Sequence, residues 1–169
     1  MSEAFARPFR PVELTSSTLT SFPLQAMAQQ LMTEETFQTS GRNALTLIHH
    51  THLTVVLTVL KAGAILDEHH APAPVTLLPL LGEIILTSAA GQTSLTLTQG
   101  TGAVFAARLP HRVEAQQDSA FVLVMGGQDH DLGAVDPRPM RTLVGSRKGP
   151  FDVDLACAGR RHLMRHAAG

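Results

Sequence analysis

Histidine is the residue type in this chain best suited to chemistry near neutral pH, because its imidazole exchanges a proton there. The 169 residues include nine histidines. Two groups stand out: the sequence HHTH, which holds His49, His50 and His52, and the adjacent pair His69 and His70. An imidazole can bind a divalent metal, act as a general base, or orient a small polar ligand. The elements that carry the histidines decide which of these roles is open.

The pair His69 and His70 closes the run GAILDEHH, which predicts a β-strand, and the loop APAP follows at once. Successive side chains on a strand leave opposite faces. A metal site built on one strand therefore favours His-x-His spacing. His69 and His70 can reach one site only if the strand ends or bulges between them.

The HHTH group lies where one predicted strand should turn into the next. Its spacing leaves a metal clip open, but a polar hairpin turn is the favoured interpretation.

Short segments rich in β-branched residues fill the middle of the chain, and turn residues separate them. The predicted strands are ALTLIHH, LTVVLTVL, VTLLPLL, EIILTSA, TSLTLTQ, AVFAA, HRVEAQ and SAFVLVM. In TSLTLTQ, outward Thr and inward Leu alternate as in a half-buried strand. About eight short strands with no helices between them predict an all-β domain, an antiparallel sandwich or barrel.

Three regions are expected along the chain. Residues 1–41 should form an N-terminal arm and a helix, with Ser21 as its N-cap and Pro23 in its first turn. Leu24, Met27, Ala28 and Leu31 share one helical face, which should pack on the core or on another subunit, and Gly41 should end the region. Residues 42–126 should form the barrel, and residues 127–169 an irregular C-terminal extension that ends in a possible short helix.

Composition excludes several classes of partner. The formal net charge is −1, and Trp and Tyr are absent, so no base-stacking surface and no general attraction to nucleic acid or membrane are expected. No apolar run approaches the ~20 residues of a membrane span. The single cysteine, Cys157, suits a reducing cytoplasm and is not expected to be catalytic. The basic stretch from Arg138 to Arg165 is expected to be a solvated tail, with polyanion binding as the alternative.

Two segments carry a resemblance to a known family. They are GAILDEHHAPAPVTLLPLLGE, which begins at Gly63, and GTGAVFAARLPHRV, which begins at Gly100. Their spacing of glycine and histidine resembles the two motifs of the cupin superfamily, and the likeness covers residues 43–125. Within that superfamily, EHHAPAP and PHRVEAQQDSAFVLV are similar to a group of small bacterial single-domain cupins. The resemblance implies a jelly-roll β-barrel, often paired into a homodimer.

Many cupins hold a divalent metal with three histidines and a glutamate. Carried over by position, the first and last histidines fall on His69 and His111. The second histidine falls on Ala71, and the glutamate falls on Val75. In the second motif, the proline, the inner glycine and the closing asparagine fall on Ala106, Arg108 and Ala115. Only two of the four ligand positions therefore hold ligand residues.

The resemblance thus implies two imidazoles, His69 and His111, inside an apolar barrel that Val75, Leu77 and Leu81 help to line. The principal expectation is a small-molecule ligand bound by His69, His111, Val75 and Leu77. One divalent ion (Zn, Fe, Mn or Ni) stays open, with His69 and His111 joined by His70 if the chain kinks, or by Asp67 if the strand is regular. The alternative function is a metal-dependent oxygenase or isomerase that uses His69 and His111.

Charged residues near these motifs have weaker interpretations. Arg108 and Arg112 flank His111 and could meet an anionic ligand, but surface positions are favoured for both. Glu83 is expected to face solvent, and a catalytic role for it is the lesser alternative.

Overall fold

The computed structural model describes residues 9–88 and 92–127. These residues form two helices, α1 (Leu24–Thr33) and α2 (Glu35–Ser40), and nine strands. The strands are β1 (Arg42–His50), β2 (Leu53–Leu60), β3 (Ile65–His69), β4 (Val75–Leu81), β5 (Glu83–Ser88), β6 (Thr93–Thr98), β7 (Ala103–Phe105), β8 (His111–Ala115) and β9 (Ser119–Gly126). The expected extension beyond Gly127, its basic stretch, Cys157 and the possible C-terminal helix lie outside the described residues.

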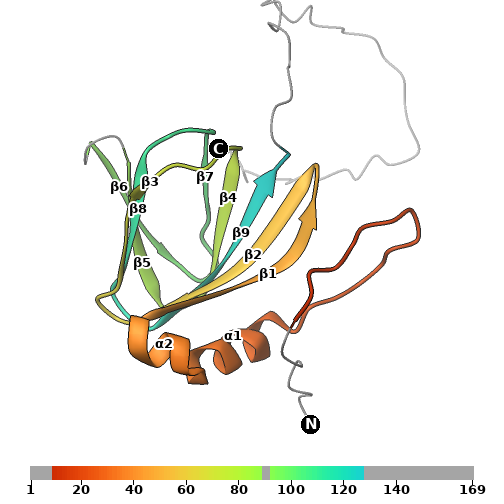
Figure 1. The fold of residues 1–169 in the computed structure, drawn as a ribbon. Coiled ribbons are helices and arrows are strands. Elements are labelled where there is room, and N and C mark those ends of the chain that lie inside the picture. Colours follow the sequence, from red (N-terminus) through yellow and green to blue (C-terminus); the bar gives the residue numbers. More distant parts are fainter. Residues whose placement is uncertain (1–8, 89–91, 128–169) are drawn as a thin grey trace, which may run out of the picture. The chain divides into compact units, whose positions relative to one another are not determined.

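The strands form two antiparallel sheets, as Figure 1 shows. The larger sheet has the order β1-β2-β9-β4-β7, and the smaller sheet has the order β3-β8-β5-β6. Strands adjacent in sequence often belong to different sheets, and the chain passes from β4 in one sheet to β5 in the other through the single residue Gly82. This topology confirms the predicted all-β fold of jelly-roll type.

The barrel interior lies between the two sheets and is apolar. Side chains that alternate along each strand meet there, and Leu77, Ile84 and Phe121 are at most 1% exposed. Part of the outer face of the larger sheet is buried as well, because α1 and α2 pack against it (Figure 1). Burial on both faces explains why β2 and β9 are nearly continuous apolar runs.

Helix α1 confirms the predicted apolar stripe but not its predicted cap. Met27, Ala28 and Leu31 are buried in one cluster with residues of β1, β2 and β9. Helix α2 ends at Ser40, and Gly41 is its C-cap. The N-cap is Pro23 rather than Ser21, and no side chain caps the helix. The helix begins later than predicted because the backbone carbonyl of Pro23 accepts the bond from the Met27 N–H at 3.0 Å.

The described part of the N-terminal arm, residues 9–23, contains no helix and pairs with the edge strand β1 at one point. Val12 forms an isolated parallel bridge with Ile48 on β1, and its N–H donates to the Leu47 carbonyl at 2.8 Å. None of the helices among the described residues is long and apolar enough to cross a membrane.

Candidate ligand-binding site

The inner face of the smaller sheet changes from apolar to polar toward one end. Strand register gives three cross-strand rows on this face, made of residues from β8, β5 and β6 in that order. The rows are Ala115–Ile84–Leu97, then Val113–Leu86–Leu95, then His111–Ser88–Thr93. Two apolar rows thus end in a polar one, where the core gives way to the barrel mouth.

A β-bulge adds His69 to this polar row. Leu66 pairs with Val113, and regular alternation would then place Glu68 opposite His111. The register shifts by one residue between Leu66 and His69, so that His69 pairs with His111 instead. A bulge of this kind re-aims a side chain. It also removes the shared parity that was expected to place Asp67 on the face of His69.

The two imidazoles lie close together, and an aromatic ring flanks one of them. The ring centroids of His69 and His111 are 4.4 Å apart, and those of Phe105 and His111 are also 4.4 Å apart. Phe105 belongs to β7 in the larger sheet, so the ring of His111 bridges the two walls of the barrel. His111 is only 5% exposed, whereas His69 is exposed at the rim. The expected convergence of the two histidines is therefore present.

Backbone carbonyls determine the orientation and the tautomer of both rings. The Nδ1 atom of His69 lies 2.8 Å from the Asp67 carbonyl oxygen, and that of His111 lies 2.8 Å from the Leu109 carbonyl oxygen. A carbonyl oxygen can only accept, so Nδ1 carries the hydrogen in both rings. When the rings are neutral, each Nε2 is left as a hydrogen-bond acceptor.

The environment of His111 favours its neutral form. Burial lowers its pKa from the ordinary value of 6.5, and this is the largest effect. The hydrogen bond to the Leu109 carbonyl opposes it, whereas repulsion from His69 and His70 lowers the pKa further. At neutral pH His111 is therefore an uncharged acceptor.

A small cavity of about 160 Å³ lies beside His111. Its described lining residues are Leu86, Ser88, Thr93, Leu95, Ala103, Val104, Phe105, Leu109 and His111. Most of these side chains are apolar, and two hydroxyl groups and one imidazole supply the polarity. Leu95, which was predicted to be buried, is 44% exposed because it lines this open cavity on edge strand β6.

Val75 and Leu77 face the barrel interior from β4. They are 2% and 0% exposed and belong to the packed core, and neither is among the described residues that line the cavity. Val75 pairs with Phe105 and so supports the ring that flanks His111. Leu81, also expected inside, is 46% exposed at the end of β4.

The donor set does not fit a resident metal ion of the cupin type. Catalytic zinc sites use about three protein ligands, but no group of three or more His, Cys, Asp or Glu side chains within residues 9–88 and 92–127 is arranged to hold a metal. His70 is exposed beyond the end of β3, and the Asp67 backbone carbonyl, not its carboxylate, contacts His69. Two imidazoles are what the described residues bring together.

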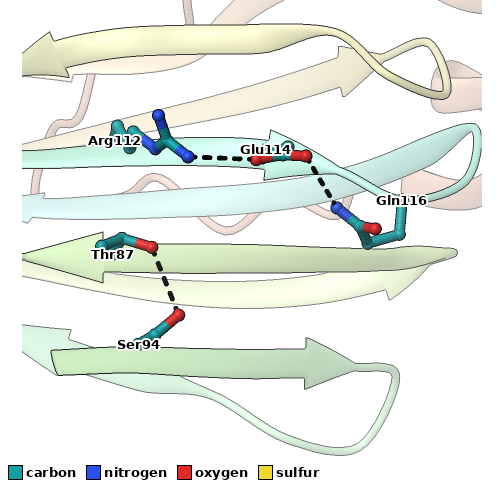
Figure 2. Close-up of polar contacts among 5 residues, drawn as sticks. All are labelled: Thr87, Ser94, Arg112, Glu114 and Gln116. Carbon is teal, nitrogen blue, oxygen red and sulfur yellow. Dashed lines mark hydrogen bonds and ion pairs between the residues drawn. The ribbon is translucent and has the colours of Figure 1, made fainter. Parts of the chain in front are cut away.

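Arg112 lies on the outer face of the smaller sheet, opposite in parity to His111. It forms an ion pair with Glu114 at 3.3 Å, and Gln116 donates to the same carboxylate at 3.2 Å (Figure 2). Across the same outer face, Thr87 and Ser94 bond at 3.3 Å. Arg112 is therefore a surface residue, as favoured from the sequence.

Arg108 is exposed, and its N–H donates to the Ala71 carbonyl at 2.8 Å, which ties the loop after β7 to the loop after β3. Its φ of 62° is left-handed, at the very position where the cupin motif has a glycine. Glu83 is half-buried, and its carbonyl accepts a bond from the Gln116 N–H at 2.9 Å.

The HHTH group forms the predicted hairpin turn. β1 ends at His50, β2 begins at Leu53, and the His52 N–H donates to Nδ1 of His50 at 3.3 Å. His49 and His50 also border a wide, open depression of about 800 Å³, together with Glu13, Leu14, Thr51, Thr54, Pro72, Ala73, Met125 and Gly126. This depression does not include His69 or His111. The smaller and less open cavity beside His111 is therefore the stronger candidate for a specific ligand.

Sequence reasoning did not identify Ser88, Thr93 and Phe105. Each is an ordinary strand residue, and its place beside His111 follows from cross-strand register and from the packing of one sheet on the other. The polar ends of EIILTS and TSLTLT were the available signal, but only pairing of the two strands places Ser88 opposite Thr93.

No family model and no curated protein matches the sequence of this chain. Solved structures do match its fold. A conserved protein of unknown function from Streptococcus pyogenes is 19% identical, with a TM-score of 0.53 over 71% of this chain and 96% of that one. A cupin superfamily protein from Desulfitobacterium hafniense is 14% identical, with a TM-score of 0.54 over 70% of this chain and 99% of that one.

A third match is an RmlC-like cupin protein from Desulfovibrio desulfuricans, 18% identical, with a TM-score of 0.52 over 64% of this chain and 97% of that one. Two antiparallel sheets in jelly-roll order and these neighbours agree with the resemblance seen in the two sequence motifs. The chain has the fold of the cupin superfamily.

Proposed function

We propose that this cupin-fold chain binds a small molecule at the mouth of its barrel, in the cavity beside His111. The observation that carries the proposal is the position of a buried, neutral imidazole on the wall of a cavity of about 160 Å³. The Nδ1 atom of His111 is bonded to the Leu109 carbonyl. No buried side-chain nitrogen or oxygen among the described residues lacks a partner, so Nε2 is accessible and is free to accept a hydrogen bond from a ligand.

The size and lining of the cavity support a ligand of one ring or less. An apolar cavity of about 150 Å³ is large enough to bind benzene. The mixture of an apolar wall with a few polar groups is typical of small-molecule sites. His69 at the rim and the two hydroxyl groups of Ser88 and Thr93 would then orient the ligand.

A metal-dependent oxygenase or isomerase, the alternative expected from the resemblance, lacks a supporting observation because the described residues present two imidazoles and no third ligand. The homodimer and the cytoplasmic location remain predictions. Sedimentation equilibrium would test the dimer.

Ligand-observed NMR with single-ring compounds tests the proposal. We expect toluene, phenol, anisole or benzoate to show saturation transfer from the wild-type protein. The variant Leu95→Phe places a ring against the cavity and should abolish the transfer. Leu81→Phe is the matched control, because Leu81 is equally exposed, at 46% against 44%, but does not line the cavity.

If none of the four compounds binds, or if Leu95→Phe and Leu81→Phe retain binding equally, the cavity is not a ligand site.

A further inference from the structure

Backbone carbonyl groups determine which ring nitrogen of His69 and His111 donates a hydrogen bond and which one accepts. Both His69 and His111 donate their Nδ1 hydrogen to a main-chain carbonyl two residues earlier, each at 2.8 Å. Neither carbonyl can donate in return, so rotating the rings or exchanging the tautomer would break a bond in each case. The backbone therefore leaves Nε2, not Nδ1, as the free nitrogen on two rings whose centroids lie 4.4 Å apart.

The deeper of these two acceptors stays uncharged near neutral pH, because burial lowers the pKa of His111 and neighbouring His69 and His70 lower it further. A neutral Nε2 accepts a hydrogen bond and repels another lone pair. A carboxylate, which only accepts, would meet an acceptor there.

No positively charged side chain in the described lining would offset the unfavourable contact between a carboxylate and Nε2 of His111. The cavity is lined by apolar side chains with the hydroxyls of Ser88 and Thr93, and no Lys or Arg is among its described lining residues. Arg112 is on the outer face of the sheet and is paired with Glu114. An anion would therefore lose its hydration without gaining a positive charge.

We propose that the site selects an uncharged, mostly apolar molecule with one hydrogen-bond donor, such as a small alcohol, phenol or primary amide, and discriminates against carboxylates. The donor bonds to Nε2 of His111, and the apolar body packs on Phe105, Leu86 and Leu95. The ring of His69 lies beside that of His111, with the centroids 4.4 Å apart. The inference rests on the proposed ligand site and adds the chemical class of its ligand.

Dissociation constants for four compounds of similar size test the selection at pH 7.5. Phenol has a donor, anisole has the same oxygen without one, benzoate is an anion, and toluene lacks both. We expect phenol to bind at least about fivefold more tightly than anisole, which is the factor expected for one net hydrogen bond. Benzoate should bind more weakly than toluene.

The histidine ring nitrogens provide a readout that simple hydrophobic binding would not change. In ¹⁵N-histidine-labelled protein, phenol should shift the Nε2 resonance of His111 and leave that of Nδ1 nearly unchanged. Toluene should shift neither. In His111→Leu the preference of phenol over anisole should fall to about one, while toluene still binds.

The outcomes separate the two proposals. Equal affinity for phenol and anisole in the wild-type protein, or benzoate binding more tightly than phenol, overturns the donor selection but leaves the ligand site intact. Failure of all four compounds to bind overturns the ligand site itself. Because the decisive comparison uses the wild-type protein, it stands even if His111→Leu does not fold.

Discussion

Replacing Gly82 with alanine should destabilise the barrel far more than the same replacement at Gly63. Both glycines have a left-handed backbone, with φ of 75° and 78°. They differ in what surrounds them. A Cβ atom at Gly63 would meet no atom within 4 Å, whereas one at Gly82 would meet the Ser119 hydroxyl and lie 2.5 Å from the Asp118 carbonyl oxygen and 2.9 Å from the Ser119 Cα.

The expected magnitudes follow from these surroundings. A left-handed residue other than glycine costs about 1–2 kcal/mol, and the stiffer unfolded chain offsets about 0.4–1 kcal/mol of this. Gly63→Ala should therefore lose at most about 1.5 kcal/mol of unfolding free energy. At Gly82 the overlap with backbone adds about 1–3 kcal/mol to the net conformational cost of about 0–1.5 kcal/mol, giving a total of about 1–4.5 kcal/mol.

Urea unfolding of the two variants, followed by circular dichroism, measures the difference directly. For a chain of this size each 1 kcal/mol lowers the Tm by about 2–4 °C, so Gly82→Ala should melt about 2–18 °C below the wild type. The contact with Ser119 is buried, and the Ser119 hydroxyl lies 2.7 Å from the Gln117 carbonyl oxygen and 3.1 Å from that of Glu83. This leaves little room for the new methyl group.

Equal losses of unfolding free energy in the two variants would refute the reasoning, because they would show that the left-handed conformation alone, and not the close approach of Gly82 to β9, makes glycine necessary.

The position of Gly82 matters for the candidate site. Gly82 is the one residue between β4 and β5, and β5 carries Ser88 to the polar row.

Four further predictions follow from particular residues. The folded pKa of His111 lies below 6.5, so the unfolded chain binds more protons than the folded chain between that pKa and 6.5. The contribution of His111 to the free energy of unfolding should therefore be complete above pH 6.5 and fall as the pH drops toward the folded pKa. Urea unfolding of the wild type and of His111→Gln across this range should show this loss in the wild type alone. Arg108→Gly should raise the unfolding free energy by about 0.5–1 kcal/mol by removing left-handed strain, measured by the same titration; an unchanged or lower value would contradict the strain. Leu31→Ala, at 0% exposure, should cost about 2–5 kcal/mol, whereas Leu19→Ala, at 97% exposure, should be neutral by thermal melting. Dialysis against a chelator should leave the Tm of untagged protein unchanged, and a lowered Tm would show that a metal contributes to the fold.

Local patterns determined the elements of this fold. Alternating β-branched segments predicted the strands, and α1 buries Met27, Ala28 and Leu31 because their spacing places them on one helical face. The spacing of His69 and His111 in two family motifs was enough to predict that distant parts of the chain converge. At the inner-glycine position of the second motif, Arg108 has a left-handed backbone.

Local sequence patterns predicted less well the features that depend on contacts with neighbouring residues. Ser21 is a good cap by composition, but the Pro23 carbonyl accepts the first helical bond. Val75 and Leu77 were predicted to contact a ligand. Close packing between the sheets places both in the core, and a ligand contact for either residue stays a prediction. Burial of this kind depends on what the opposite sheet contributes.

The sequence by itself therefore determined which segments are strands, which face of α1 is buried and which two histidines share the barrel. Tertiary structure alone decided what those histidines face. The bulge before His69 and the pairing of His111 with Ser88 depend on register between strands far apart in the chain. The contact of His111 with Phe105 depends on the packing of one sheet on the other. The physical reason is that strand periodicity sets only the face on which a side chain lies, whereas pairing and packing between strands choose its neighbours.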